Sequence, residues 1–334
     1  MHEKALPRIT VTMGYPAGIG PELVIKTLSQ QRFRHLCRIM IVGDLRILQK
    51  AAKIYSTSVN RNTIKNVKQA EYKPAEPDLI DLQNVPVGDF RWGEIVPSLG
   101  KASGEYLEVA WKAATEGKTD GIVSGVLNKE ALNKGGYTCR DELELISRIT
   151  QSRESFTVGV TGNLWTIPVT THIPFKEIHE KITKDRVLNH IKVMDELMRR
   201  YGFSQPRIGV AALNVHGGED RLFGGEEAEA ISPAILEARR IGIDASGPFP
   251  ADTIFVRALR EEFDCIVGMY HDQINIARKL IAGMKSVTLF MGLPVPCGTP
   301  AHGTALDIAG RGTADSSGME TAIEAVSKLA RFKQ

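Results

Sequence analysis

Short runs of β-branched and apolar residues recur along the whole chain, and segments with helical spacing separate them. The runs cover residues 9–13, 39–43, 121–125, 156–160, 166–171, 208–213, 265–270 and 286–291. Apolar residues at helical spacing predict helices over 21–30, 103–116, 184–201, 225–241 and 318–331. Strands that alternate with helices are typical of an α/β fold. The segment 52–91 has weaker signals, and we expect it to hold a peripheral insertion or a small extra strand pair.

The length of the chain indicates more than one domain. Its 334 residues allow about two domains at roughly 150 residues each. Because the sequence contains no obvious linker, we expect the two domains to be joined by chain crossings within sheets and to enclose a cleft.

The composition excludes several classes of protein. Lys and Arg number 42 and Asp and Glu number 39, so the net charge of +3 lacks the basic excess of a nucleic-acid-binding protein. No stretch approaches roughly 18 consecutive apolar residues, and the first residues lack the order of a signal peptide. We therefore expect a cytoplasmic protein that binds neither membranes nor nucleic acid. The four cysteines have no Cys-x-x-Cys spacing and are expected to be reduced thiols.

Three histidines stand where predicted strands end. His172 follows the strand at 166–171, His216 follows 208–213 and His271 follows 265–270. Ligands of open α/β sheets bind beyond the carboxyl ends of strands, so these imidazoles could converge on one divalent cation with open positions. Asp272 beside His271 could orient its ring. The alternative is that each is an ordinary hydrogen-bonded loop histidine.

Two glycine-rich segments are candidates for anion or nucleotide contact. The segment 14–22, GYPAGIGPE, lies between the first strand and the first helix, and it is either an anion-binding helix start or only a tight turn. The segment 298–318 combines glycines with polar side chains before the last helix. It either wraps a nucleotide or merely connects two elements.

Seven blocks, read in order, resemble one known family. They are GYPAGIGPE, SGVLNKEAL, VTTHIP, NVHGGE, GPFPADTIF, MYHDQ and AHGTALDIAGRG. Together they resemble the 4-hydroxythreonine-4-phosphate dehydrogenase (PdxA) family over nearly the whole chain. The resemblance implies a two-domain α/β/α fold of the isocitrate/isopropylmalate dehydrogenase type, a homodimer, and NAD-dependent oxidation of a secondary alcohol at a divalent metal. We expect two domains. Residues 1–129 plus 283–334 would form the nucleotide-side domain, and residues 130–282 would form the domain for metal binding, substrate binding and dimerisation.

The resemblance also assigns roles to single residues. It implies that one ion (Zn, Mg, Mn or Co) binds His172, His216 and His271, with ligands drawn from both subunits. Lys279 and Asp252 are candidates for proton transfer, and Lys279 also for substrate contact, although a solvated helix lysine is the alternative. Arg311 leaves some room for NADP. The residues expected to bind the adenosine part of NAD are His302, Gly303, Thr304, Ala305, Asp307, Ile308 and Gly310.

The residues that correspond to substrate contacts differ from those of the family. Where relatives that bind a substrate phosphate have Gly-His-Thr-Glu, this chain has residues 141–144, Asp-Glu-Leu-Glu. Cys297 stands where the family has a substrate-contacting arginine, and Thr288 replaces an asparagine that neighbours this arginine. A charged Glu142 about 4 Å from a phosphate charge would cost roughly 4 kcal/mol at an effective dielectric near 20. We therefore expect an unphosphorylated hydroxy acid or diol, such as an aromatic carboxylate cis-dihydrodiol, with decarboxylation possible after oxidation.

Two alternatives remain open. One is a true 4-hydroxythreonine-4-phosphate or 4-phosphothreonate dehydrogenase, in which Arg140 and Lys129 bind the phosphate. The other is a catalytically silent binding paralogue, although retention of all three histidines and of the nucleotide segment argues against it.

Overall fold

A computed structural model describes residues 5–58, 61–73, 76–86, 88, 90–282 and 286–332. The chain divides into two compact units, residues 1–156 with 287–334 (unit 1) and residues 157–286 (unit 2). The first boundary falls at 156 and not at 129, because helices α5 (Lys129–Lys134) and α6 (Glu142–Thr150) both pack on α4 (Pro97–Thr115). The chain therefore completes this helical layer before it enters unit 2.

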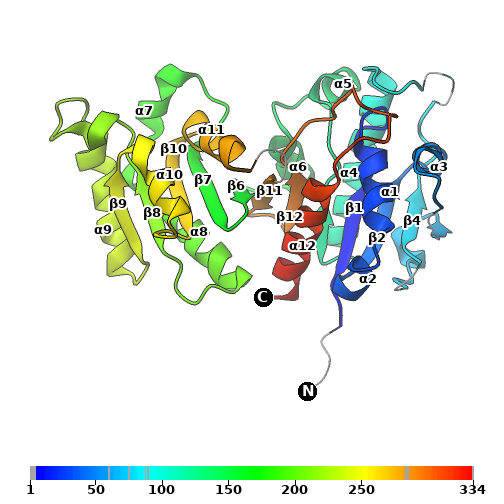
Figure 1. The fold of residues 1–334 in the computed structure, drawn as a ribbon, viewed down its shortest axis with the longest axis horizontal. Helices are drawn as coiled ribbons and strands as arrows, with labels where there is room; N and C mark the ends of the chain where they lie inside the picture. The colour runs from blue at the N-terminus through cyan, green and yellow to red at the C-terminus, as the bar shows by residue number, and fades with distance from the viewer. Residues whose placement is uncertain are drawn as a thin grey trace. The chain divides into compact units, whose positions relative to one another are not determined.

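Unit 1 is built on one largely parallel sheet (Figure 1). Its strand order is β3-β4-β2-β1-β5-β12-β11, and only the β11–β12 pair is antiparallel. The edge pair β3 and β4 comes from the segment 52–91, so this weakly patterned stretch extends the main sheet. The strands are β1 (Arg8–Thr12), β2 (Arg38–Gly43), β3 (Asn62–Ile64), β4 (Asp78–Asp81), β5 (Gly121–Val123), β11 (Ser286–Met291) and β12 (Cys297–Pro300).

Helices cover both faces of the unit 1 sheet (Figure 1). One layer contains α1 (Gly20–Leu28), which contacts α3 (Leu45–Ile54) and α12 (Ser317–Arg331). The other layer contains α4, whose Tyr106 and Trp111 are almost completely buried. The short helices α2 (Phe33–Leu36) and η1 (Val67–Gln69) complete the unit.

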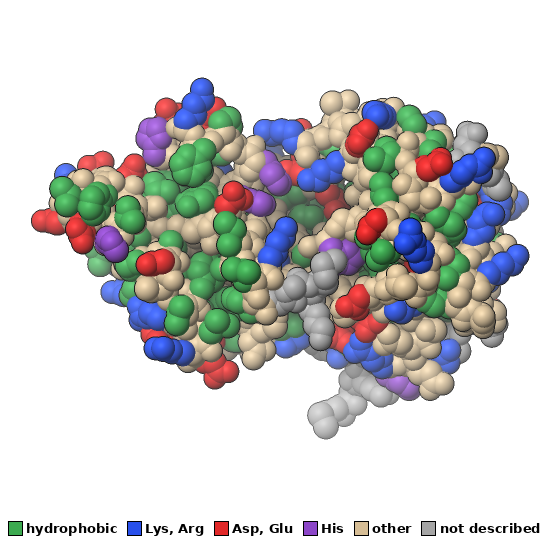
Figure 2. Space-filling view, turned by 45° about the horizontal axis from the view of Figure 1, so that its top comes forward, with side chains coloured by type: hydrophobic (Ala, Val, Ile, Leu, Met, Phe, Trp, Pro, Cys, Tyr) green, Lys and Arg blue, Asp and Glu red, His purple; other side chains and the backbone are tan. Residues whose placement is uncertain are grey.

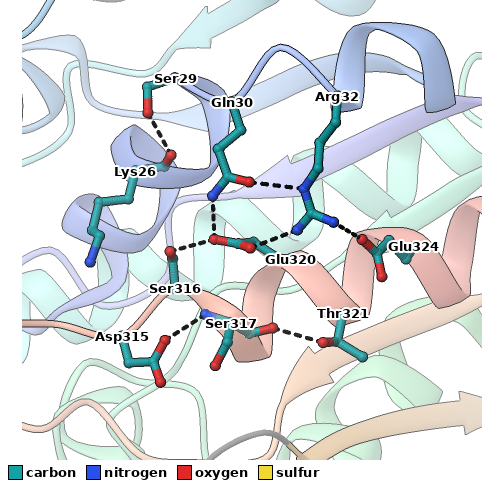
Figure 3. A network of polar contacts seen from close by, with 10 residues as sticks. All are labelled: Lys26, Ser29, Gln30, Arg32, Asp315, Ser316, Ser317, Glu320, Thr321 and Glu324. Atoms are coloured by element: carbon teal, nitrogen blue, oxygen red, sulfur yellow. Dashed lines mark hydrogen bonds and ion pairs between the residues drawn. The ribbon is translucent and has the colours of Figure 1, made fainter. Parts of the chain in front are cut away.

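Polar contacts fix the start of α12 to the end of α1 (Figure 3). The Glu320 carboxylate accepts hydrogen bonds from the side chains of Gln30, Arg32 and Ser316. Lys26 Nζ donates to the carbonyl oxygen of Ala314 at 2.6 Å. The glycine-rich segment that precedes α12 is therefore anchored at its far end.

The strands of unit 2 are ordered β6-β7-β10-β8-β9. Strand β10 is parallel to β7 and to β8, β8 is parallel to β9, and β6 is antiparallel to β7. Helix α8 (Lys184–Tyr201) begins after Thr183, whose side chain accepts the Arg186 N–H. It ends at Gly202, which is in the left-handed region (φ 113°) that glycine adopts readily at helix ends. The strands are β6 (Phe156–Thr161), β7 (Leu164–Thr170), β8 (Ile208–Ala211), β9 (Ala245–Phe249) and β10 (Cys265–Tyr270).

The helical segments of unit 2 include one irregular turn. The predicted helix over 225–241 starts as a π turn, η5 (Glu227–Ile231), and continues as α9 (Ser232–Arg240). Such π turns are rare and are often found at functional sites. The remaining segments are η3 (Phe175–Glu177), α7 (Ile178–Lys181), α8 (Lys184–Tyr201), η4 (Val215–Gly218), α10 (Ala251–Leu259) and α11 (His271–Ala282).

The cysteines agree with the expectation of reduced thiols. Cys37, Cys139, Cys265 and Cys297 are all buried free thiols. Among the helices that the structure describes, none has the length and apolar character needed to cross a bilayer.

Candidate active site

The three predicted histidines gather at one edge of the unit 2 sheet. Strands β7, β10 and β8 are parallel neighbours, so their carboxyl ends lie at the same edge. His172 follows β7, His216 follows β8, and His271 begins α11 directly after β10. All three side chains are exposed.

His172 and His271 are close neighbours. Their ring centroids lie 5.5 Å apart, with the ring planes at 41°. Two imidazoles that bind one ion at about 2.0–2.1 Å place their ring centres roughly 5 Å apart, so this pair fits a shared ion. His271 Nδ1 lies 2.6 Å from the Asp272 carboxylate, which would orient the ring and leave Nε2 for a ligand.

His216 lies in a strained loop. Residues 216–221 all have positive φ, from 39° at Glu219 to 82° at Gly218. His172 shares this feature, with φ of 49°. The left-handed region costs roughly 1–2 kcal/mol for each residue other than glycine, so such a run needs support from its surroundings.

Glu227, which the sequence analysis did not select, holds this loop. Its carboxylate is 5% exposed and accepts the N–H groups of Leu213 and Asn214, both at 2.8 Å. The side chain of Asn214 adds a third bond at 2.9 Å. Glu227 comes from the π turn η5, so that irregular turn positions the segment that carries His216.

The described residues of the chain do not form a three-ligand metal site. Across the part of the chain that the structure describes, no group of three or more His, Cys, Asp or Glu side chains is arranged to hold an ion. The structure brings His172 and His271 together, but it does not join His216 to them in such a group.

The two glycine-rich segments of unit 1 form a single structural feature. The Glu22 carboxylate, fully buried, accepts the N–H groups of Gly310 at 2.7 Å and Gly312 at 2.9 Å. The Tyr55 hydroxyl donates to the same carboxylate at 2.8 Å. The backbone N–H of Ile19 bonds to the carbonyl oxygen of Thr304 at 3.0 Å. The segment 14–22 therefore holds the segment 302–312 in place.

The segment 302–312 offers polar groups to a ligand. Gly303 is exposed with open space around its Cα, and Asp307 is exposed. His302 Nδ1 lies 3.0 Å from the carbonyl oxygen of Gly303, while its buried Nε2 has no hydrogen-bond partner among the described residues. Gly310 (φ 80°) packs so closely on Trp92 that a side chain there would clash. These features fit a segment that approaches a nucleotide with its backbone.

Glu142 lies at the first position of α6, where Asp141 caps the helix by accepting the Glu144 N–H at 2.9 Å. Burial raises the pKa of Glu142 to about 7, and the nearby Asp141 charge adds to the rise, whereas Ser124 and Lys129 oppose it. Desolvation therefore favours the neutral form of this acid, whereas the sequence analysis expected a full negative charge.

Arg140 and Lys129, the two cations expected to bind a substrate phosphate, differ in their relation to Glu142. Arg140 pairs with Glu144 at 3.2 Å and is mostly exposed, so its guanidinium is engaged away from Glu142. Burial and the Glu142 charge together raise the pKa of Cys297, which places this buried thiol near the carboxyl group. Lys129, at the start of α5, is the cation that acts on Glu142.

The remaining candidate residues are accessible. Asp252 is exposed in the first turn of α10, and Lys279 is exposed on α11, two turns beyond His271. Thr288 is half-buried in β11 of unit 1. A cavity of about 450 Å³ between α1 and α3 is lined by none of the predicted site residues.

Comparison with known proteins identifies the family. The family model described as "Pyridoxal phosphate biosynthetic protein PdxA" matches residues 35–326. The chain belongs to the PdxA family. As a PdxA protein it is a dehydrogenase that acts on a CH–OH group of a small molecule, and PdxA dehydrogenases use NAD(P) and a divalent metal.

Individual relatives match nearly the whole length of this chain. A protein of Oceanobacillus iheyensis named "Putative D-threonate 4-phosphate dehydrogenase" is 39% identical over 98% of this chain and 99% of its own. The structure of 4-hydroxythreonine-4-phosphate dehydrogenase from Klebsiella pneumoniae is 34% identical and covers 97% of this chain and 99% of its own, with a TM-score of 0.83. The structure of a terephthalate 1,2-cis-dihydrodiol dehydrogenase from Burkholderia xenovorans is 25% identical, covers 96% and 98%, and has a TM-score of 0.68.

Proposed function

We propose that this PdxA protein is an NAD-dependent dehydrogenase that oxidises a secondary hydroxyl group of a four-carbon acid phosphorylated at its far end, such as D-threonate 4-phosphate or 4-hydroxythreonine 4-phosphate. The observation that carries the proposal is the similarity, at 39% identity over 98% of the chain, to a protein named for a 4-phosphorylated substrate. The dihydrodiol dehydrogenase is more distant in both sequence and structure. Comparison therefore favours the phosphorylated alternative over the unphosphorylated substrate that the charge of Glu142 had indicated.

A divalent ion would bind at His172 and His271, with the third ligand, His216, supplied by the other subunit of a homodimer. The strained His216 loop supports this arrangement, because its neighbours Val215 and Leu222 are 64% and 70% exposed in a single chain. Hydrophobic side chains, drawn in green in Figure 2, reach the surface of unit 2 elsewhere as well. Burial of such side chains against a second copy would offset the backbone strain.

The metal would polarise the substrate hydroxyl group and lower its pKa. Lys279 and Asp252 are the side chains proposed to accept or relay the proton, since both are exposed on the helices that follow β10 and β9. The segment from His302 to Gly310 would hold the adenosine part of NAD. Its anchoring by Glu22 keeps the backbone donors in place before the nucleotide arrives.

A substrate panel tests the proposal. NADH formation would be measured with Mg²⁺, Mn²⁺, Co²⁺ or Zn²⁺ on D-threonate 4-phosphate, 4-hydroxythreonine 4-phosphate, their unphosphorylated counterparts and terephthalate cis-dihydrodiol. We expect the highest kcat/KM for one of the two phosphorylated acids. Preference for the dihydrodiol would overturn the substrate proposal, and a folded, metal-loaded protein without turnover on any of them would indicate a silent paralogue.

A further inference from the structure

The side-chain amide of Gln273 links the ends of strands β10 and β8. Its Oε1 accepts the backbone N–H of Met269, in β10, at 2.7 Å, and its Nε2 donates to the carbonyl oxygen of Ala212, just after β8, at 2.8 Å. Met269 lies two residues before His271, and Ala212 lies four residues before His216. One amide therefore joins the two strand ends that lead to two of the predicted metal ligands.

The surroundings of this amide are built to hold it. Strand β10 has Gly268 beside it, where a Cβ atom would lie 3.0 Å from the Gln273 Oε1 and 2.4 Å from the side chain of Ile274. Both backbone partners, Met269 and Ala212, belong to residues that are fully buried. Water cannot easily replace either hydrogen bond, so the amide is needed to satisfy these backbone groups.

The segment after β8 is also held from two other sides. The Ala212 N–H donates to the carbonyl oxygen of Phe249, at the end of β9, at 2.8 Å. The Glu227 carboxylate accepts the N–H groups of the next two residues. These contacts fix the start of the segment just before the strained run that begins at His216. Gln273 adds a tie from this segment to α11, the helix that begins with another predicted ligand.

We propose that Gln273 is a positioning residue that sets the place of the His216 segment relative to His271 and thereby controls the affinity for the metal. The inference rests on the proposed function, because it takes both histidines as ligands of a divalent ion. Gln273 acts through the backbone of the two segments. In the proposed homodimer, the His216 that it aligns serves the site of the other subunit. Loss of a group that orients a metal ligand typically lowers metal affinity about 10- to 100-fold.

A double-mutant cycle on metal affinity tests this role. Gln273→Met keeps the length of the side chain but can neither accept from Met269 nor donate to Ala212. Calorimetry would give the Kd for Co²⁺, without substrate or nucleotide, for the unmodified protein, Gln273→Met, His216→Ala and the double variant. We expect Gln273→Met to raise Kd about tenfold or more and to change the visible absorption of the bound Co²⁺. In the His216→Ala background it should add little, because the ligand that it positions is gone.

A second variant separates positioning from a general loss of stability. Ile266 is fully buried in β10, and Ile266→Val removes one methylene group without touching a polar contact. This variant should lower the Tm of the metal-free protein and leave the Kd for Co²⁺ unchanged. Gln273→Met should change both. A fall in Tm alone, as in Ile266→Val, would show that Gln273 only supports the fold and would overturn the inference.

Failure of the inference can be distinguished from failure of the proposed function. If His216→Ala weakens Co²⁺ binding but Gln273→Met leaves it unchanged, or weakens it equally in both backgrounds, the inference is overturned and the proposed function stands. If His216→Ala leaves the Kd for Co²⁺ unchanged, His216 is not a ligand, and both the inference and the proposed metal site are overturned. Turnover of D-threonate 4-phosphate by the unmodified protein reports on the proposed substrate separately.

Discussion

The imidazole rings of His172 and His271 lie with their centroids 5.5 Å apart, although 98 positions separate the two residues in the sequence. The parallel pairing of β7 with β10 produces this closeness, because it carries both chain segments to the same edge of the sheet. Asp272 beside His271 then orients one of the two rings. The pair is the part of the proposed metal site that one chain provides.

Replacement of either His172 or His271 by alanine should abolish metal binding and turnover. Removal of one of three imidazole ligands weakens a divalent site by orders of magnitude. Metal content after dialysis and NADH formation are the two measurements. His179→Ala, an exposed histidine on α7, is the matched control and should retain both. Full activity of the unmodified protein after rigorous metal removal would contradict the metal assignment.

Mixed dimers test where His216 acts. If His172 and His271 of one subunit meet His216 of the other, a dimer of a His172→Ala chain with a His216→Ala chain keeps one intact site. Random mixing should then restore about one quarter of the activity, since about half of the dimers are mixed and each carries one of two sites. A mixture of His172→Ala with His271→Ala should restore none. Equal recovery in both mixtures, or none in either, would refute this arrangement.

Glu22→Gln should weaken NAD binding more than catalysis. The buried carboxylate holds the N–H groups of Gly310 and Gly312, and hydrogen bonds to a charged acceptor contribute about 1.5–3 kcal/mol. We expect KM for NAD to rise about tenfold or more while kcat changes little. Tyr55→Phe removes only one donor from the same carboxylate and should have a smaller effect. An unchanged KM for NAD in a folded Glu22→Gln protein would disprove the anchoring role.

Glu142→Gln should stabilise the free protein at high pH. Burial raises the folded-state pKa of Glu142 to about 7, above its unfolded value, so the carboxyl group contributes most to stability below pH 4.5 and loses that contribution as pH rises through 7. At pH 8.5 the variant should exceed the unmodified protein by up to about 3 kcal/mol in unfolding free energy, relative to their difference at pH 4.5. Urea unfolding at both pH values measures this change. An equal difference at both would show that the folded protein holds Glu142 ionised.

Sequence patterns predicted many of the strands and five of the helices, but they missed helices such as α3, α10 and α11 as well as the contacts between distant segments. All eight predicted strand segments exist, because β-branched runs in buried parallel strands are strong signals. Strands β9 and β12 were missed, since Ala-Ser-Gly-Pro-Phe and Cys-Gly-Thr-Pro carry no such run. Burial by neighbouring strands stabilises both, and this information is not local.

The same limit applies to the candidate site. The three histidines could be selected from the sequence because each directly follows a predicted strand. Glu22 and Gly310 are 288 positions apart, and Glu227 reaches its loop from a π turn, so neither carboxylate could be assigned from spacing. The sequence shows the Glu142 carboxyl group but not its burial, so the rise in its pKa could not be predicted.

The ratio of kcat/KM for D-threonate 4-phosphate to that for unphosphorylated D-threonate, at pH 7 with NAD and a divalent metal, tests the central claim most directly. If the protein acts on the phosphorylated acid, its phosphate-binding groups should make that acid better by at least about two orders of magnitude, the discrimination expected from a site whose polar groups are left unpaired without the phosphate. A ratio near or below one would contradict the account.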